Sequence, residues 1–172
     1  MGRSEHAEEW KHWLKANVHR LLLYARQQTR TEADAEDVLQ DAVMRVWNAR
    51  IIRSSGEEPS PAEVFTAIRR CAIDLARKEN RRIQREILFV QSEPEPVVWF
   101  ENRLESNEHD KQIEEALRLI PVRFREVITL KIWGNLTFVE ISNTLDIPVN
   151  TAASRYRYGL ESLKKQLNLP VA

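Results

Sequence analysis

The apolar residues in the first half of the chain recur at helical spacing. Between residues 32 and 49 they follow the intervals i, i+3, i+4, i+7, i+8, i+11 and i+12, which makes one continuous apolar stripe. Its members are Ala35, Val38, Leu39, Ala42, Val43, Val46 and Trp47. Residues 8–29 and 62–86 show the same periodicity. We predict three helices here, because no strand-like alternation occurs in residues 1–90.

The second half predicts four shorter helices, over 110–120, 121–133, 138–146 and from 151 onward. Pro121 suits the first position of its helix, because a helix needs no N–H bond there. Gly134 and Asn135 are predicted to end that helix. Thr137 and Glu140 form a T-x-x-E capping box for the next one.

Two further residues are predicted to cap helices through their side chains. Thr31 precedes the helix of residues 32–49, and the carboxylates in its first turn suit the helix dipole. Asn150 ends the short turn 147–150 and is predicted to cap the last helix. The last two helices are therefore expected to meet across a tight turn.

Two stretches are predicted to lie between helices. Residues 53–61 contain the Gly, Pro and Ser typical of a loop. Residues 89–106 contain two prolines and many acids, with an apolar cluster at 97–100, and predict a linker. We therefore predict an all-α fold of two small helical domains joined by a flexible acidic linker, the C-terminal one a helix-turn-helix. The predicted boundaries are 1–88 for the first domain, 89–110 for the linker and 111–172 for the second domain.

The charges along the chain are segregated, although its 26 basic and 26 acidic residues balance. Residues 69–85 hold seven basic and two acidic side chains. Residues 86–115 hold two basic and nine acidic side chains, and residues 151–172 hold four basic and one acidic. Two basic segments separated by an acidic one indicate two anion-binding surfaces on two modules.

The composition excludes several classes of protein. No apolar run approaches the roughly 20 residues that span a bilayer, and the N-terminus has no signal-peptide core, so we expect a cytoplasmic protein without membrane insertion. The single cysteine, Cys71, cannot form an internal disulfide. The four histidines lack metal-ligand spacing, and no phosphate loop or nucleophile motif occurs. The sequence therefore predicts no enzyme, no metal and no cofactor.

The last predicted helix has two distinct faces. Its apolar face consists of Ala152, Tyr156, Gly159, Leu160 and Leu163, and its small first residues allow a close approach to the preceding helix. The opposite face and its flanks carry hydrogen-bonding side chains: Asn150, Thr151, Ser154, Arg155, Arg157 and Tyr158. A helix-turn-helix places such a face in the major groove of DNA. A helical hairpin for protein contact would show the same pattern, so both interpretations stay open at this point.

Three segments resemble, in the same order, the parts of bacterial RNA polymerase sigma factors of the extracytoplasmic-function (ECF) type. Residues 34–47 resemble the family's polymerase-binding helix, and residues 67–82 resemble the segment that melts the downstream (−10) promoter element. Residues 117–167 resemble the module that reads the upstream (−35) element. The resemblance implies no catalysis by this chain, and core RNA polymerase and promoter DNA as partners. An anti-sigma factor is left open as a further partner.

The resemblance implies roles for three sets of residues. The polymerase-binding set consists of Asp34, Asp37, Gln40, Asp41, Arg45 and Trp47. The downstream-element set consists of Arg69, Arg70, Asp74, Arg77, Lys78, Arg81 and Arg82. The upstream-element set consists of Asn150, Thr151, Ser154, Arg155, Arg157 and Tyr158.

Simpler structural roles stand beside these assignments. The polar residues of the polymerase-binding set are also typical of a solvated helix face, and Trp47 of a core residue. On its own predicted helix, Asp74 has basic neighbours three or four residues away, which is the spacing of intrahelical ion pairs: Arg70, Arg77 and Lys78. Cys71 is predicted to be a small buried apolar residue rather than a redox sensor.

Several positions depart from the usual pattern of the family. Ala153 and Tyr158 stand where a basic residue is common, Gly159 where Ala is common, and Arg70 where Asn is frequent. Fewer cations predict weaker phosphate contact at the upstream element. Two other functions therefore stay open: a helix-turn-helix transcriptional regulator, and a sigma homologue that only binds a partner protein. A regulator with a receiver domain fits poorly, because such a domain alternates strands with helices.

Overall fold

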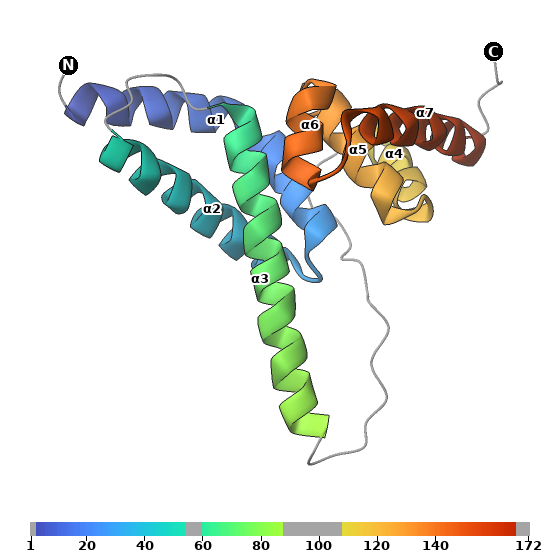
Figure 1. Ribbon diagram of the computed structural model, residues 1–172, viewed down its shortest axis with the longest axis horizontal. Coiled ribbons are helices and arrows are strands. Elements are labelled where there is room, and N and C mark those ends of the chain that lie inside the picture. Colours follow the sequence, from blue (N-terminus) through green and yellow to red (C-terminus); the bar gives the residue numbers. More distant parts are fainter. Residues whose placement is uncertain (1–2, 54–59, 88–107, 168–172) are drawn as a thin grey trace. The chain divides into compact units, whose positions relative to one another are not determined.

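The computed structural model describes residues 3–53, 60–87 and 108–167. Within these ranges the chain forms seven α-helices and no strand, which confirms the predicted all-α class. The chain divides into two compact units, Met1–Phe100 and Glu101–Ala172 (Figure 1). The predicted apolar cluster at 97–100, residues 89–107 of the predicted linker and most of the predicted loop 53–61 lie outside the described residues.

The first unit consists of three helices, each of which packs against the other two. They are α1 (Arg3–Gln28), α2 (Glu32–Arg53) and α3 (Pro61–Ile87). Thr31 caps α2 as predicted, because its Oγ1 accepts a hydrogen bond of 3.0 Å from the backbone N–H of Asp34. The predicted stripe of α2 forms its core face, where Ala35, Val38 and Ala42 are buried.

The core of the first unit is rich in aromatic rings. Tyr24 of α1 meets Phe65 of α3 edge to face, with ring centroids 5.4 Å apart. Trp10 of α1 stacks on Trp13, and its centroid lies 5.5 Å from that of Trp47 of α2. These contacts fasten both ends of α1 to the other two helices.

The C-terminal half of α3 extends past α1 and α2 (Figure 1). The last buried residue of α3 is Ala72, and no residue from Ile73 to Glu86 is buried. Because this segment is strongly basic, its charges stay in water rather than in the core. The first unit therefore presents a solvated, cationic helix.

The second unit consists of four helices: α4 (Glu108–Leu119), α5 (Val122–Ile132), α6 (Phe138–Leu145) and α7 (Val149–Gln166). Helix α7 packs against each of the other three. A buried cluster joins α4, α5 and α7 through Ala116, Leu117, Ile120, Ile128 and Leu163.

The predicted signals between α5 and α6 are confirmed. Asn135 adopts the left-handed conformation (φ 53°) just after the end of α5. Thr137 accepts a hydrogen bond from the backbone N–H of Glu140 at 3.2 Å. The Glu140 carboxylate accepts one from the backbone N–H of Thr137 at 2.7 Å, which completes the capping box.

Two predicted helix starts are wrong by a short distance. Pro121 is the residue before α5 rather than its first residue. Asn150 does not cap α7, because that helix already begins at Val149 after Pro148. Proline fixes its own φ near −65°, which is −59° at Pro148, and it has no N–H to satisfy. The helix therefore starts at the next residue of the chain. Asn150 therefore lies inside the first turn of α7.

Candidate functional site

The turn between α6 and α7 is held by local hydrogen bonds. Asp146 ends α6 in the left-handed conformation, with φ 55° and ψ 52°. The Ser142 hydroxyl donates to the carbonyl oxygen of Ile147 at 2.5 Å, and the N–H of Ile147 donates to the Ser142 carbonyl at 3.1 Å. These bonds fix the direction in which the chain enters α7. The geometry is that of a helix-turn-helix, with α7 as its second helix.

The inner face of α7 is packed closely against α6 and α5. Ala152 is fully buried, and the Tyr156 ring meets Phe138 of α6 with centroids 5.7 Å apart. At Gly159 the backbone of α7 lies so close to the side chains of α5 that an added Cβ atom would lie 2.8 Å from Cδ1 of Ile128. Glycine therefore lets α7 lie directly on α5, with its polar face turned outward.

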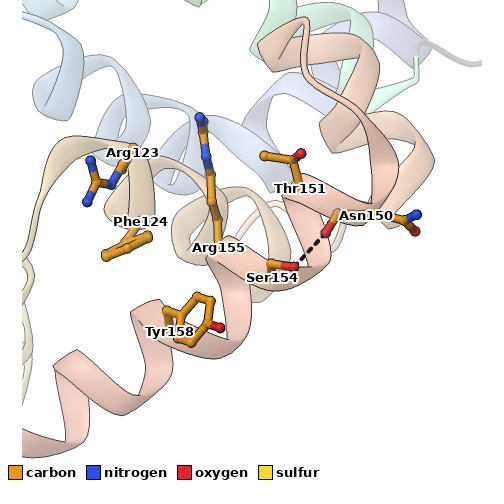
Figure 2. A pocket seen from close by; sticks show the side chains of 7 residues that line it. All are labelled: Arg123, Phe124, Asn150, Thr151, Ser154, Arg155 and Tyr158. Carbon is orange, nitrogen blue, oxygen red and sulfur yellow. Dashed lines mark hydrogen bonds between the residues drawn. The ribbon is translucent and has the colours of Figure 1, made fainter.

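The structure brings five of the six upstream-element residues together around one surface depression of about 450 Å³, here called the α5–α7 recess. They are Asn150, Thr151, Ser154, Arg155 and Tyr158 (Figure 2). Arg157 is exposed but does not line it. The recess is completed by Arg123 and Phe124 from the first turn of α5. Sequence reasoning missed these two residues, because nothing in the pattern places the first turn of α5 beside the outer face of α7.

Several side chains at the recess are held by neighbours. The Ser154 hydroxyl donates to the carbonyl oxygen of Asn150 at 2.8 Å (Figure 2), so the lone pairs of its oxygen stay free to accept. The Arg157 guanidinium lies 4.9 Å from the centroid of the Tyr158 ring, and its Nη2 donates to the Tyr158 hydroxyl at 3.1 Å. These contacts present an ordered set of donors and acceptors along α7.

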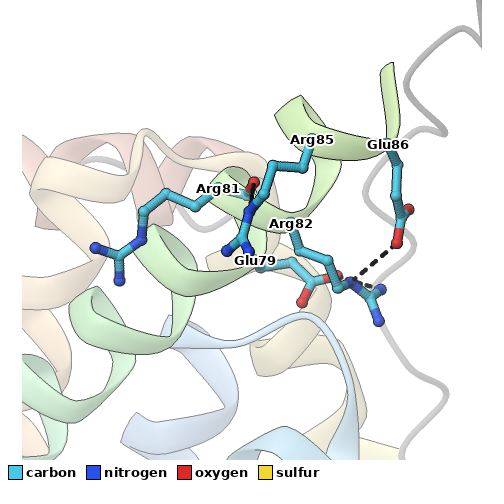
Figure 3. A network of polar contacts seen from close by, with 5 residues as sticks. All are labelled: Glu79, Arg81, Arg82, Arg85 and Glu86. Carbon is cyan, nitrogen blue, oxygen red and sulfur yellow. Dashed lines mark hydrogen bonds and ion pairs between the residues drawn. The ribbon is translucent and has the colours of Figure 1, made fainter. Parts of the chain in front are cut away.

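The downstream-element residues spread along the solvated part of α3. Arg70, Arg77, Lys78 and Arg81 are exposed, whereas Arg69 is half-buried. Arg82 pairs with Glu79 at 2.8 Å and with Glu86 at 3.8 Å (Figure 3).

The cations of this segment differ in their surroundings. Among the described residues, Arg77, Lys78 and Arg81 form no ion pair, whereas Arg82 is already held by two carboxylates. Arg85, a further predicted candidate for the downstream element, donates from Nε to the Arg81 carbonyl at 3.1 Å. The side chains best able to meet an incoming phosphate are thus Arg77, Lys78 and Arg81.

Asp74 pairs across two helices rather than along its own. Its Oδ2 lies 3.6 Å from Nη1 of Arg45 on α2. The basic residues of α3 that the sequence spacing suggested as partners of Asp74 do not form this ion pair. Residues predicted to serve two different surfaces therefore meet in one ion pair.

Most of the predicted polymerase-binding set lies on the outer side of α2. Asp37, Gln40 and Asp41 are exposed, and Asp34 is half-buried. Met44, which sequence reasoning missed, lies one and two turns beyond the two exposed aspartates and is 51% exposed. An exposed methionine beside these carboxylates adds an adaptable apolar contact.

Trp47 is different from the other members of that set. It is half-buried, and its ring packs against Trp10 of α1. Its packing supports the core role that the sequence left open beside polymerase contact.

Cys71 is buried between α2 and α3, as predicted, and is 5% exposed. Burial raises the pKa of its thiol above the ordinary value, and the carboxylates of Asp41 and Asp74 act in the same direction. Arg45 opposes them. A protonated, enclosed thiol is a packing group rather than a reactive one.

Each helix in the described part of the chain is too short or too polar to span a bilayer. No three His, Cys, Asp or Glu side chains come together there as a metal site would require.

The family model described as Sigma-70 region 2 matches residues 13–82. This range holds all of α2 and most of α1 and α3, with the polymerase-binding and downstream-element sets. The match ends before the second unit begins.

Three curated proteins are similar to the chain. The ECF RNA polymerase sigma factor SigK of Mycobacterium tuberculosis is 27% identical over 165 residues, which cover 95% of this chain and 86% of that protein. The ECF sigma factor RpoE of Cereibacter sphaeroides is 27% identical over 138 residues, or 79% and 74% of the two chains. The ECF sigma factor SigW of Bacillus subtilis is 37% identical over 67 residues, or 39% and 36%.

A crystal structure of the sigma factor RpoE in complex with the anti-sigma factor NepR, from Bartonella quintana, contains a similar chain. The TM-score is 0.72 at 21% sequence identity, and the match covers 95% of this chain and 99% of the other. At this identity the likeness shows a shared fold.

Proposed function

We propose, from the premise that this chain belongs to the ECF RNA polymerase sigma factors of the sigma-70 family, that its two helical units divide promoter recognition between them. As an ECF sigma factor, the chain directs transcription initiation through RNA polymerase. It is an initiation factor and not an enzyme. RNA synthesis is left to the polymerase.

The first unit, in this proposal, binds core polymerase through α2 and the downstream element through α3. The exposed carboxylates Asp37 and Asp41, with Met44 beside them, form a mixed charged and apolar surface suited to a protein partner. The exposed cations of α3 lie on a helix that stands clear of its own core. That position lets DNA approach the helix without displacing either neighbour.

The second unit reads the upstream element with the outer face of α7. One observation supports this role above the others: the helix-turn-helix geometry turns five predicted contact residues outward around one recess. Residues near the start of a recognition helix meet base edges, and long cations on its flanks meet phosphates. We therefore assign Asn150, Thr151 and Ser154 to bases, and Arg155 and Arg157 to phosphates.

We propose functional boundaries at 1–88 and 111–172, with the acidic segment 89–110 between them. An acidic tether suits the basic, nucleic-acid-binding channel of a polymerase. Limited proteolysis tests this division. Early cuts between residues 86 and 110, with release of two stable helical fragments, support it, and early cuts inside 117–167 contradict it.

We further propose core RNA polymerase and promoter DNA as the partners and the cytoplasm as the compartment. An anti-sigma factor is a candidate third partner, since the similar Bartonella quintana chain was crystallised with one. The acidic face of α2 and the basic face of α3 are the surfaces that such a protein would have to cover.

Reconstitution with core RNA polymerase tests the proposed function. The full chain should form a holoenzyme and give run-off transcripts of defined length from a subset of genomic fragments, whereas core enzyme alone should not. A holoenzyme that forms but initiates nowhere would favour the homologue that only binds a partner. A chain that binds DNA without polymerase would favour the helix-turn-helix regulator.

A further inference from the structure

The α5–α7 recess contains two residues from outside the recognition helix. Arg123 and Phe124 belong to the first turn of α5, yet they line the same depression as Arg155 and Tyr158 (Figure 2). The Arg123 guanidinium carbon lies 4.9 Å from the centroid of the Phe124 ring. The recess thus has a cation and an aromatic ring on each side, contributed by two helices.

We infer that the α5–α7 recess binds one backbone phosphate of upstream promoter DNA, held by Arg123 together with Arg155. This inference rests on the proposed function and adds a DNA-positioning residue from α5. Two guanidinium groups match a phosphate in charge and in hydrogen-bond geometry. The rings of Phe124 and Tyr158 supply apolar surface for the carbons of the adjoining deoxyribose.

The lining of the recess favours an anion. None of its seven residues is acidic, and among the described residues no carboxylate pairs with Arg123. Contact with the Phe124 face orients the planar guanidinium but uses none of its N–H donors. Arg123 is therefore both positioned and free to donate.

The place of Arg123 in the fold favours phosphate over a base edge. In helix-turn-helix complexes the second helix enters the major groove, while the elements beside it contact the backbone. Arg123 lies on such a neighbouring helix. It supplies a cation at the side of α7, where Ala153 and Tyr158 leave the helix itself with few.

The test uses holoenzyme reconstituted from the full chain and core RNA polymerase, in a series of salt concentrations. The probe is a duplex that wild-type holoenzyme selects from a library with randomised upstream sequence. Arg123→Gln should weaken binding several-fold and lower the slope of log K against log salt by about one. The selected upstream sequence should stay the same, because a phosphate carries no sequence information.

Two matched variants separate this contact from general effects. Arg123→Lys keeps the charge and should restore most of the salt slope. Lys164→Gln removes an exposed cation of α7 about 21 Å from Asn150 along the helix, and should leave slope and affinity unchanged. Circular dichroism melting should show the same transition for all three.

Three outcomes would overturn the inference. Equal salt slopes for Arg123→Gln and Lys164→Gln would mean that Arg123 meets no phosphate. A changed upstream motif would mean that Arg123 reads a base. Loss of polymerase binding with unchanged DNA binding by the free chain would make the recess a protein contact. If Arg123→Gln melts at a lower temperature than the wild type, the test uses Arg123→Lys instead, whose salt slope should stay close to the wild-type value. If the wild type selects no upstream sequence, the proposed function itself fails.

Discussion

The side chains of Arg45 and Asp74 form an ion pair between α2 and α3, with Nη1 of Arg45 3.6 Å from Oδ2 of Asp74. Arg45 belongs to the polymerase-binding set and Asp74 to the downstream-element set. The two proposed surfaces of the first unit therefore adjoin at this pair. A substitution at either residue alters the charge of both surfaces, and its effect on transcription cannot be assigned to one of them alone.

A double-mutant cycle of Arg45→Gln and Asp74→Asn should show that this pair contributes little to stability. Both side chains are more than half exposed, at 59% and 57%, and the coupling of exposed pairs is about 0.2–1 kcal/mol. Urea unfolding of the two single variants and the double variant measures it. Loss of promoter opening by Asp74→Asn at unchanged stability would mean that the pair acts in transcription rather than in folding, whereas a coupling well above 1 kcal/mol would make the pair structural.

Reversal of the two exposed aspartates of α2 should weaken the complex with core polymerase. Asp37→Lys with Asp41→Lys should raise the Kd about tenfold or more, which is about 1.4 kcal/mol, because it reverses the charge of the proposed contact face. Helical circular dichroism should not change, since both residues lie in water.

Glu36→Lys is the matched control for this prediction. Glu36 is also exposed but lies at the edge of this face, about 100° round the helix from Asp37 and one turn before Gln40. Its reversal should have a much smaller effect in a competition assay for core polymerase. If the double reversal leaves the Kd unchanged, this face of α2 is not the contact surface.

Local signals were sufficient to predict most of the helices. The stripe of α2 shows its period over more than three turns, and the caps at Thr31 and Thr137 need only residues within three positions. The start of α7 was missed where two local signals compete. Asn150 is a good cap by type, but the fixed φ of Pro148 starts the helix first.

Contacts between helices could not be predicted in the same way. The pairing of Arg45 with Asp74 depends on how α2 crosses α3, and nothing in either helix specifies the partner. The recess depends on the close approach of α7 to α5, which brings Arg123 beside Arg155. The pattern of α7 did identify its outer face, because amphipathic period alone decides which side is buried.

The thiol of Cys71 should react slowly in the folded protein. Burial raises its pKa, so the thiolate is scarce at pH 8, and the enclosed side chain excludes the reagent. Labelling with a maleimide should be slow in buffer and fast in urea. Equal rates in both would contradict a buried thiol.

The raised pKa of the Cys71 thiol also predicts how the stability of the protein changes with pH. The folded state keeps the thiol proton to a higher pH than the unfolded state does. The contribution of Cys71 to the unfolding free energy is therefore complete below the ordinary thiol pKa and is lost as pH rises through the folded pKa. A Cys71→Ala variant should lack this part of the alkaline decline in urea titrations.

Gly159→Ala should destabilise the second unit. The added Cβ would lie 2.8 Å from Cδ1 of Ile128 and 3.1 Å from Cβ of Phe124, and overpacking of this kind costs about 1–3 kcal/mol. Alanine gains up to about 1 kcal/mol in helix propensity, so the cost of overpacking should exceed this gain and the unfolding free energy should fall. Ile128→Val removes the Cδ1 atom and should partly rescue Gly159→Ala. Thermal unfolding measures both, and a gain in stability from Gly159→Ala alone would contradict the close packing.

The outer face of α7 should contain residues of two kinds, which substitutions distinguish. The Ser154 hydroxyl gives its hydrogen to the carbonyl of Asn150 and can accept from a base donor in the groove. Ser154→Ala should therefore cost about 1–3 kcal/mol at its preferred sequence and relax the preference at one position. Arg155→Ala should weaken binding to all upstream sequences alike and lower the salt slope by about one.

Selection of upstream sequences from a random library by wild-type and variant holoenzymes measures this difference. Ser154→Ala holoenzyme should select a motif that is degenerate at one position. Arg155→Ala holoenzyme should select the wild-type motif but bind it more weakly. Arg157→Ala removes a guanidinium held against Tyr158 and should act like Arg155→Ala, with some loss of stringency where the Tyr158 ring borders the groove. Wild-type motifs at wild-type stringency from both Ser154→Ala and Arg157→Ala would mean that this face does not read the promoter. The homologue that only binds a partner protein would then be the better explanation of the helix-turn-helix.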